Sequence, residues 1–473
     1  MKIKKIIKSL PYPVEKVVRY FYSSLPLRIR YGKTFWSTYN LLKESQYWTK
    51  RRIEDYQMKE LNKLLNYAYE NVPYYNKVFK DIELKPDDIQ SFKDLKKLPF
   101  LTKEIIREKT RELISKKYTE KNLEFVTTGG STGTPMGFYV DKKDYFEREW
   151  AFMVSQWNRV GYKFGSKSAV LRGNIIKRTK RGIYWSYDPI FKNLYLSTYH
   201  MNEKTLPKYI QIIRDFKPDF LWNYPSAAAI LARFMKKNSI KPFESIKALL
   251  CGSENLYPWQ KKLLEEVFNC RVYSWYGHTE QAVLAGECED SSYYHIFPEY
   301  GFVELINKNR VINNDSEYGE IVATGFNNYA FPFIRYKTQD IAKYIDYRCN
   351  CGRNYKLFEK IEGRTQDLVI SSDGRLITLT ALIFGQHFNS FSRLREMQII
   401  QEKKGELLIK IVKTPDFSDN DKNEIASRIY DAVGGGLEIN FKFVDSIPRT
   451  KSGKMRFLIQ KLSIDSNKFN IKV

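Results

Sequence analysis

The segment from Asp219 to Trp275 alternates short apolar runs with amphipathic stretches, and this alternation strongly constrains the fold. The pattern predicts strands at Asp219–Tyr224, Ile246–Cys251 and Arg271–Trp275, separated by helices at Pro225–Met235 and Trp259–Phe268. Strands that alternate with helices of this length form βαβ units on a parallel sheet. Ligands of such sheets bind beyond the carboxyl ends of the strands. Gly252-Ser253-Glu254 and the pentad from Tyr276 to Glu280 directly follow two of these strands, so a binding site is predicted there.

A loop without bulky side chains runs from Thr127 to Pro135 and reads Thr-Thr-Gly-Gly-Ser-Thr-Gly-Thr-Pro. It lies between two apolar runs, Leu123–Val126 and Phe138–Val140. Glycines and small hydroxyl residues let backbone N–H groups surround a polyphosphate without steric obstruction. The loop is not a Walker A motif, because no Gly-Lys-Ser/Thr closes it, and it lacks the G-x-G-x-x-G spacing. By itself it indicates either a phosphate-binding loop or an ordinary surface linker.

The pattern changes near Asp367. Met397–Gln401 and Glu406–Val412 are typical of a hairpin that turns at Lys404-Gly405. A helix is predicted from Ser418, followed by a strand at Leu437–Val444. These elements form a small α+β domain, and near its end Ile447 to Lys454 presents a lysine on a Ser-Gly turn.

Taken together, the polar motifs of the chain have a family likeness. They are the Thr128–Pro135 loop, Gly252-Ser253-Glu254, Tyr276–Glu280, Arg335–Asp340, Gly363–Asp367 and Ile447–Lys454. In this order they resemble the adenylate-forming (acyl-AMP) ligase superfamily. Within it they are most similar to the phenylacetate–CoA ligase-like branch, which includes capsular polysaccharide biosynthesis proteins.

The resemblance implies an α/β fold with two unequal parts. A large N-terminal domain would carry βαβ units on mixed sheets with a small barrel-like part, and a small mobile α+β lid domain would follow it. We place a basic N-terminal arm at residues 1–55, the large AMP-binding domain at 56–366 and the lid at 367–473.

The resemblance also implies a nucleotide site. Asp340 would take both ribose hydroxyls, which suits a carboxylate because it accepts two O–H bonds. Gln339 departs from the pattern, since the family has glycine there. The residues expected to contact ATP or AMP are Thr128, Gly129, Gly130, Ser131, Thr132, Gly133, Thr134, Gly252, Glu254, Tyr276, Gly277, Asp340 and Arg364.

Three residues are expected to serve catalysis. Glu280 would hold Mg²⁺, which prefers one or two carboxylates together with phosphates and water. Thr279 would contact the α-phosphate. Lys454 would neutralise charge while the substrate carboxylate attacks the α-phosphorus, and it would withdraw with the lid for a second half-reaction.

The expected function is ATP-dependent activation of a carboxylic acid to acyl-AMP, followed by acyl transfer in polysaccharide or capsule biosynthesis. The acceptor is CoA in much of the family. Here Ser371–Ile377 departs from the Gly-Val-Asn-hydrophobic-Pro pattern of phenylacetate–CoA ligases, which favours the capsule-associated branch, with a sugar amine, a hydroxyl or a carrier as the acceptor in place of CoA. The alternative from another class is a non-catalytic, nucleotide-binding scaffold protein in a membrane-associated glycan-assembly complex.

The cysteines suggest a metal site. Cys288 and His295, together with Cys349 and Cys351, supply three sulfurs and one imidazole, which is a complete tetrahedral set for structural Zn²⁺. Reduced, buried cysteines are the alternative.

A net charge of +25 would attract anions, but the lysines are scattered and no nucleic-acid-binding motif stands out. No nucleic-acid partner is therefore expected. Residues 1–33 differ, because their basic side chains face a single acid, Glu15, and alternate with apolar ones. Such a stretch either rests on an anionic membrane or packs on the body of the protein. With no signal peptide or long apolar run, the chain is predicted to be cytoplasmic, with possible peripheral contact at the inner face of the membrane.

Overall fold

The computed structural model describes residues 12–127, 136–174, 176, 181–201, 203–312, 317–364, 368–374, 376–378, 382, 390, 393–433, 436–450 and 455–462. Within these residues, helices alternate with strands in one part of the chain, and a run of strands follows in another. This mixture of helices and strands confirms the predicted α/β fold class. The predicted phosphate loop, Thr128 to Pro135, lies outside the described residues, as do Asp367 and Lys454.

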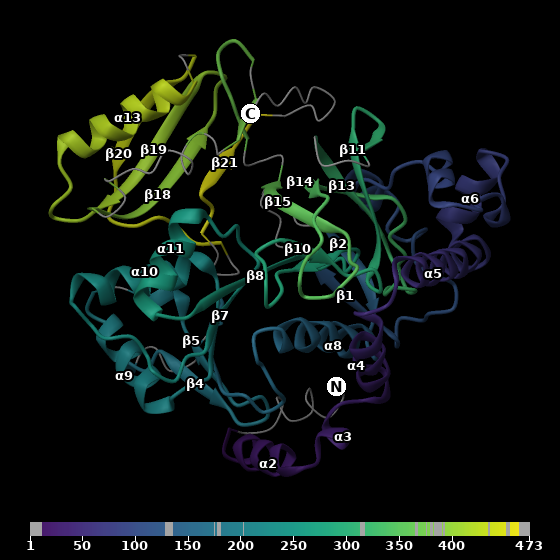
Figure 1. Ribbon diagram of the computed structural model, residues 1–473, viewed down its shortest axis with the longest axis horizontal. Helices are drawn as coiled ribbons and strands as arrows, with labels where there is room; N and C mark the ends of the chain where they lie inside the picture. Colours follow the sequence, from purple (N-terminus) through teal and green to yellow (C-terminus); the bar gives the residue numbers. More distant parts are fainter. Residues whose placement is uncertain are drawn as a thin grey trace.

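A long mixed sheet forms the centre of the molecule (Figure 1). The described residues give it thirteen strands in the order β12-β11-β13-β14-β15-β10-β9-β8-β7-β6-β3-β5-β4. One half is parallel, and its strands are β5 (Asn193–Leu196), β3 (Ser168–Leu171), β6 (Phe220–Asn223), β7 (Ala248–Cys251) and β8 (Arg271–Gly277), with β4 (Trp185–Asp188) antiparallel at the edge. The three strands and two helices predicted between Asp219 and Trp275 are all present, within a few residues of the predicted bounds.

Helices pack on this parallel half and bury its apolar residues. They are α9 (Leu206–Phe216), α10 (Pro225–Lys237) and α11 (Pro258–Phe268), with the short 3-10 turn η4 (Thr198–His200) before them. Both α10 and α11 begin at a proline, whose fixed φ suits the first helical position and whose missing N–H would have no partner there. A core cluster that includes Leu221, Leu231 and Leu249 joins α10 to the strands.

The other half of the sheet is antiparallel. Its strands are β9 (Leu284–Gly286), β10 (Tyr294–Ile296), β11 (Gly301–Asn307), β12 (Arg310–Ile312), β13 (Tyr318–Gly325), β14 (Tyr336–Ile345) and β15 (Leu357–Arg364). Strand β9 pairs with β8, so the antiparallel strands continue the parallel ones without a break.

The N-terminal third is helical and wraps around the sheet (Figure 1). Its elements are α2 (Tyr12–Ser24), α3 (Leu27–Arg30), α4 (Lys33–Ser45), α5 (Lys50–Asn71), α6 (Pro73–Asp81), η1 (Pro86–Asp88), η2 (Phe92–Lys97) and α7 (Lys103–Glu108). A hairpin of β1 (Leu123–Thr127) and β2 (Gly137–Asp141) follows, with Thr127 paired to Gly137. The predicted phosphate loop therefore joins the two strands of this hairpin. Helix α8 (Tyr145–Asn158) comes next and runs across the centre of the molecule.

The C-terminal part has a sheet of its own, in the order β20-β19-β18-β21. Its elements are β16 (Leu368–Ile370), β17 (Leu376–Thr378), β18 (Leu394–Gln401), β19 (Glu406–Lys413), α13 (Asp419–Val433), β20 (Glu438–Phe443) and β21 (Leu458–Gln460). The predicted hairpin, helix and strand are present. Ser418 donates from its backbone N–H and its hydroxyl to Asp421 Oδ2, at 2.9 and 3.0 Å, which satisfies donors at the helix start.

The C-terminal part lies against α10 and α11 (Figure 1). Arg395 forms an ion pair with Glu203 at 3.0 Å, and the rings of Phe457 and Tyr257 lie 5.7 Å apart. These contacts connect the C-terminal part to the helices that follow the parallel strands, beside the edge where the binding site is predicted.

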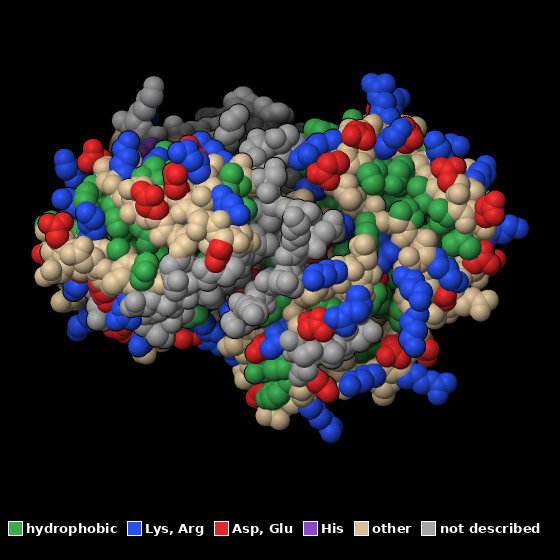
Figure 2. Space-filling view, turned by 90° about the horizontal axis from the view of Figure 1, so that it is seen from above, with side chains coloured by type: hydrophobic (Ala, Val, Ile, Leu, Met, Phe, Trp, Pro, Cys, Tyr) green, Lys and Arg blue, Asp and Glu red, His purple; other side chains and the backbone are tan. Residues whose placement is uncertain are grey.

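On the face seen in Figure 2, positive and negative side chains are mixed rather than segregated. Figure 2 shows Lys and Arg side chains spread over one face of the molecule and interspersed with Asp and Glu. This distribution differs from the continuous basic stripe that nucleic-acid-binding surfaces present. Among the residues that the structure describes, no helix is long and apolar enough to cross a membrane.

Candidate active site

A cavity of about 750 Å³ opens at the carboxyl ends of the parallel strands. Its wall includes the segments that follow β7 and β8, one end of α8, and residues of the C-terminal part. Glu254, Tyr276, Glu280 and Asp340 all line it, so the structure brings four predicted site residues from three motifs to one space.

Glu280 is the most constrained carboxylate of the cavity. Its side chain is buried, and the Tyr336 hydroxyl donates a 2.8 Å hydrogen bond to Oε1. His278 Nδ1 lies 3.1 Å from Oε2. Burial alone would raise the pKa of Glu280, but His278 and the Tyr336 hydrogen bond outweigh it and lower the pKa to about 2. Glu280 is therefore an ionised carboxylate near neutral pH, as a Mg²⁺ ligand must be.

The imidazole of His278 is oriented into the same space. It lines the cavity; Nδ1 faces Glu280, whereas Nε2 is buried and makes no hydrogen bond to another described residue. A buried polar group without such a bond costs free energy unless something else completes it. A bound ligand or water next to Glu280 would supply that partner, so the site suits a polar, metal-bearing ligand.

Asp340 is also buried, and it is held from two sides. The Tyr276 hydroxyl donates to Asp340 Oδ2 at 2.5 Å, and the backbone N–H of Asp340 donates to Thr338 Oγ1 at 3.1 Å. Two motifs that are 64 residues apart in the sequence thus meet through one hydrogen bond. The pairing of β14 with β15 sets Arg364 opposite Asp340, which brings the backbone of a further predicted residue to this place.

Gln339 occupies the position where the family has glycine. Its φ is +68°, in the left-handed region that glycine adopts without steric cost. The backbone N–H of Gln339 donates to Glu320 Oε1 at 3.1 Å, and Lys103 Nζ donates to its side-chain Oε1 at 2.6 Å. The turn keeps the glycine-like conformation, so the departure from the motif leaves the backbone before Asp340 in place.

Glu254 connects a helix of the large part to the C-terminal part. Its Oε2 accepts a hydrogen bond from the backbone N–H of Ser226 at 3.0 Å, and its Oε1 accepts from the Ser226 hydroxyl at 3.1 Å, at the first turn of α10. The backbone N–H of Met455 also donates to Oε1, at 3.3 Å. Met455 directly follows Lys454 in the sequence. Thr450 and Met455, which bracket residues 451–454, both line the cavity.

The other predicted residues take up distinct positions. Gly252 packs under the Trp275 ring so closely that a Cβ atom would lie 2.5 Å from it, and a Cβ on Gly277 would lie 3.1 Å from Leu284. Thr279 lines the cavity with an exposed side chain, while its carbonyl accepts a hydrogen bond from the Tyr145 hydroxyl of α8. Thr128, Gly129, Gly130, Ser131, Thr132, Gly133, Thr134 and Lys454 lie outside the described residues.

Several residues in or beside the cavity carry no predicted role. Tyr336 belongs to a quoted motif, but its contact with Glu280 spans 56 residues and has no local signal. Glu149 and Arg172 also line the cavity, from α8 and from the end of β3. They are single polar residues that belong to no recognisable motif, so the sequence predicts no role for them.

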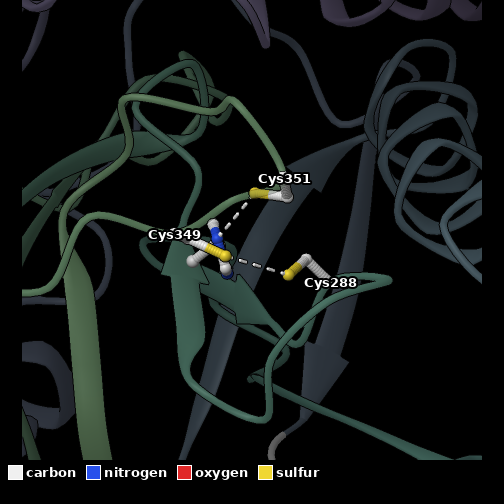
Figure 3. A group of neighbouring side chains, drawn as sticks. Cys288, Cys349 and Cys351 are labelled. Atoms are coloured by element: carbon white, nitrogen blue, oxygen red, sulfur yellow. Dashed lines mark hydrogen bonds between the residues drawn. The ribbon is translucent and has the colours of Figure 1, made fainter.

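A second polar cluster lies away from this cavity. The ligand atoms of Cys288, His295, Cys349 and Cys351 all lie within 4.8 Å of one another, and Figure 3 shows the three thiols converging. Cys288 Sγ is 3.5 Å from Cys349 Sγ, and Cys351 Sγ is 3.3 Å from His295 Nε2. The four residues paired in the sequence analysis are therefore brought together.

Comparison with known proteins agrees with this geometry. Residues 369–461 match the family described as the CapK C-terminal domain. The chain is 26% identical over 449 residues to Protein CapK of Staphylococcus aureus, which covers 92% of this chain and 94% of CapK. It is also 26% identical over 327 residues to the phenylacetate-coenzyme A ligase of Pseudomonas putida, covering 67% of this chain and 72% of that protein.

Among solved structures, the fold is similar to that of 2-hydroxyisobutyryl-CoA ligase. In its postadenylation state, in complex with 2-HIB-AMP, that ligase gives a TM-score of 0.71 at 17% identity and covers 89% of this chain and 92% of its own. In its thioesterification state, with 2-HIB-AMP and CoA, the TM-score is 0.56 at 18% identity, with 88% and 91% covered. Of these two states, the postadenylation structure is the more similar to this chain overall.

The comparisons define the class by similarity: the fold is that of the adenylate-forming ligases, which agrees with the resemblance of the motifs. Within that class, its homologues are CapK and the phenylacetate-coenzyme A ligases, and its C-terminal part is of the CapK type.

Proposed function

We propose that this chain uses ATP to convert a carboxylic acid into an acyl-adenylate and then passes the acyl group to an acceptor. A carboxylate oxygen of the acid would attack the α-phosphorus of ATP, the bond from the α-phosphorus to the bridging oxygen would break, and pyrophosphate would leave. The observation that carries the proposal is the meeting of Glu280, Asp340 and the backbone of Met455 around one cavity.

Each residue has a role that its surroundings support. Asp340, fixed by Tyr276, would accept hydrogen bonds from the ribose hydroxyls. Glu280 is ionised and would hold Mg²⁺, which when bound neutralises charge on the phosphates. Thr279 would contact the α-phosphate, and the loop from Thr128 to Thr134 would surround the β- and γ-phosphates. The preorganised hydrogen bonds of Tyr276 and Tyr336 let both carboxylates act without rearrangement.

Lys454 would bring the positive charge that the reaction needs. Its neighbour Met455 is hydrogen-bonded to Glu254 at the cavity, which supports a position for Lys454 beside the nucleotide. We propose that the lid domain, residues 367–473, carries this lysine in and then rotates away for acyl transfer. The greater similarity to the postadenylation state of 2-hydroxyisobutyryl-CoA ligase is consistent with a closed arrangement.

The decisive experiment is ATP–pyrophosphate exchange with a panel of carboxylic acids. Exchange with at least one acid is expected, and Lys454→Ala is expected to lower its rate at least 100-fold while ATP binding persists. Lys451→Ala, three residues earlier on the same turn, is the matched control and should retain nearly full exchange. Full exchange in Lys454→Ala would refute the role of this lysine. ATP binding without exchange for any acid would favour the scaffold function instead.

The acceptor is proposed to be CoA or a group in glycan assembly, namely a sugar or a carrier. CoA is proposed because the chain is similar to phenylacetate-coenzyme A ligases. A role in capsule biosynthesis is proposed because the chain is similar to CapK over nearly its whole length. Mass spectrometry of reactions that contain the activated acid and either CoA or amino sugars would identify the acyl product. An acyl-CoA product would place the chain with the CoA ligases in function as well as in fold.

We also propose that the cluster of Cys288, His295, Cys349 and Cys351 binds structural Zn²⁺. Tetrahedral zinc with bonds of about 2.3 Å to sulfur separates its ligand atoms by roughly 3.5–4 Å, which fits the distances in this cluster. His295 Nδ1 lies 3.1 Å from the Tyr293 carbonyl, which can orient the ring so that Nε2 faces the thiols. The backbone N–H groups of Asp290 and Ser291 donate to Cys288 Sγ, as is suitable for a thiolate.

Elemental analysis of the purified protein is expected to find about one zinc per chain, and a chelator should lower Tm. Cys349→Ser should lose the metal, whereas Cys270→Ser, at a cysteine outside the cluster, should retain it. Protein purified without chelators that contains no stoichiometric zinc would rule the proposal out.

Finally, we propose that the N-terminal arm contacts an anionic membrane surface. One face of α2 packs Val18 and Tyr22 against Ile190 and Phe191, so the helix is anchored on the body of the protein. Its outward face leaves Val17 69% and Phe21 71% exposed, next to the basic residues of the arm. Co-sedimentation with phosphatidylserine vesicles, but not with neutral ones, is expected, and Val17→Ser/Phe21→Ser should abolish it. Equal sedimentation of this variant and the parent protein would contradict the proposal.

A further inference from the structure

Arg172 places a positive charge inside the cavity, at the end away from Glu280 and Asp340. It directly follows β3, which is separated from β8 by β6 and β7, or about 14 Å of sheet edge at the usual strand spacing. From there its side chain extends along the edge, and its Nη2 donates to the Ser253 hydroxyl.

Aromatic rings surround the guanidinium. Its central carbon lies 4.7 Å from the centroid of the Trp222 ring, 5.2 Å from that of Tyr224 and 5.9 Å from that of Trp275. Ring faces attract a cation, and this arrangement holds the planar group in one region. Cation–π contact does not use the N–H groups at the edge of the guanidinium, which are the atoms that bind a carboxylate in a bidentate manner.

No acidic side chain neutralises Arg172 directly. Among the residues that the structure describes, none forms an ion pair with it within 4.0 Å. Glu254 is near enough to act on its charge, but the oxygens of Glu254 accept from Ser226 and Met455. Burial lowers the pKa of Arg172, although an arginine remains charged at neutral pH.

Buried arginines with a structural role differ from Arg172. Arg335 makes two 3.0 Å hydrogen bonds to the carboxylate of Glu304 and one of 2.6 Å to the Leu98 carbonyl. Arg159 donates to the carbonyls of Gly286 and Glu287 at 3.2 and 2.9 Å. Both are matched by acceptors of the protein itself, whereas Arg172 contacts aromatic rings and hydroxyls at the wall of a cavity.

The surroundings of Arg172 offer further donors. The indole Nε1 of Trp222 is buried and makes no hydrogen bond to another described residue, and Trp222 lines the cavity. Trp150 and Met153 of α8 complete an apolar wall beside it. A group that accepts hydrogen bonds and carries negative charge would satisfy both Arg172 and Trp222.

We propose that the acid activated by this chain carries a second anionic group, such as another carboxylate, and that Arg172 binds this group. The inference rests on the proposed acyl-adenylate function. One carboxylate of the substrate would react near Thr279, and the second would lie against Arg172, so this residue selects diacids over monoacids of the same size.

The test uses pairs of probes that differ in one charge. Aliphatic diacids of four to eight carbons, aromatic diacids and sugar diacids are each compared with their monoamides in ATP–pyrophosphate exchange. The parent protein is expected to prefer at least one diacid over its monoamide by 30-fold or more in kcat/KM. Arg172→Met should reduce this preference to less than 3-fold, and Arg172→Lys should retain part of it.

Controls separate this subsite from general electrostatics and from nucleotide binding. Arg233→Met removes another positive charge from the wall of the same cavity and should keep the preference for diacids. The Kd for AMP should be unchanged in Arg172→Met. A tenfold weaker AMP affinity, or a preference for diacids that survives in Arg172→Met, would overturn the proposal.

A binding readout distinguishes failure of the subsite from failure of the enzymatic function. A diacid should raise the Tm of the parent protein in the presence of AMP, and it should not raise the Tm of Arg172→Met. If this shift is seen without any pyrophosphate exchange, the subsite stands and the proposed activity fails. If monoamides exchange as well as diacids, or no diacid raises Tm or supports exchange, the subsite proposal is wrong.

Discussion

The two ends of the cavity are built in different ways. At the nucleotide end, Tyr276, Glu280, Tyr336 and Asp340 come from two contiguous motifs and are joined to one another by hydrogen bonds. At the other end, Arg172 directly follows β3 and Trp222 comes from β6, and Arg172 lies against aromatic rings rather than opposite a carboxylate. In the proposed function, ATP is bound by an interlocked group of residues, whereas the acid is bound by independent side chains, each of which can change without disturbing the rest.

The largest effect should come from the interlocked end. Asp340→Ala removes the acceptor proposed for the ribose hydroxyls and leaves the Tyr276 hydroxyl without its bond. Hydrogen bonds to a charged group contribute roughly 1.5–3 kcal/mol each, so KM for ATP should rise about 30-fold or more in steady-state kinetics. Asp346→Ala, at an exposed aspartate just beyond the same strand, is the control and should leave KM unchanged. An unaltered KM for ATP in Asp340→Ala would show that Asp340 does not bind the nucleotide.

An intermediate effect is expected from Glu149, a carboxylate of α8 that lines the cavity near His278. Burial raises its pKa to about 7, although the Tyr300 hydroxyl donates to it at 2.6 Å and His278 also favours its charged form. In the unfolded chain this carboxyl group loses its proton near pH 4. Between about pH 4 and 7 the folded state therefore binds more protons than the unfolded state, and the free energy of unfolding falls as pH rises. The loss is fully present above pH 7 and amounts to about 1–3 kcal/mol.

Glu149→Gln abolishes this titration. Relative to the parent protein, its free energy of unfolding should therefore increase by about 1–3 kcal/mol from pH 5 to pH 8, measured by urea denaturation. Glu147→Gln, two residues earlier on α8, is the matched control. The free energies of unfolding of Glu149→Gln and the parent protein could instead differ by the same amount at pH 5 and pH 8. That result would indicate that Glu149 is charged at both pH values.

The smallest effect should come from Gln339. Glycine adopts the left-handed conformation at position 339 without the cost of about 1 kcal/mol that glutamine bears, which stabilises the folded state. Two effects oppose this gain: the hydrogen bond from Lys103 is lost, and the unfolded chain gains conformational entropy. Gln339→Gly should thus remain within about 1 kcal/mol of the parent protein in urea denaturation, with unchanged exchange activity. Gln339→Val, which is β-branched, should be less stable than either. A loss of several kcal/mol in Gln339→Gly would mean that the side chain, not the turn, holds Asp340.

The sequence predicted those parts of the fold whose signals are local. Pro225 and Pro258 lie at the starts of α10 and α11, and Lys404-Gly405 lies in the connection between β18 and β19. No bounds for the antiparallel strands from β9 to β15 follow from the sequence. Leu284–Gly286 and Tyr294–Ile296 are too short to show periodicity, and Tyr318–Gly325 is buried along nearly its whole length, so it shows no alternation of buried and exposed residues. Their positions depend on pairing with distant strands.

The same distinction applies to the site. Glu280 and Asp340 were predicted because each belongs to a motif, and the four Cys and His residues because their types are rare and chemically specific. The contact of Tyr336 with Glu280 and the aromatic surroundings of Arg172 exist only after the sheet has formed. Tyrosine and arginine are common in any protein, and here their functional roles depend on which residues lie near them in the folded structure. Those contacts cannot be predicted from a local sequence pattern.

The hydrogen bond from Met455 to Glu254 has a consequence for how this enzyme can evolve. The donor is a main-chain amide, so every residue type except proline at position 455 can make it. Substitutions at the residue next to Lys454 can therefore accumulate while the contact of the tail with Glu254 is inherited unchanged. Proline at position 455 would remove the donor and with it this contact.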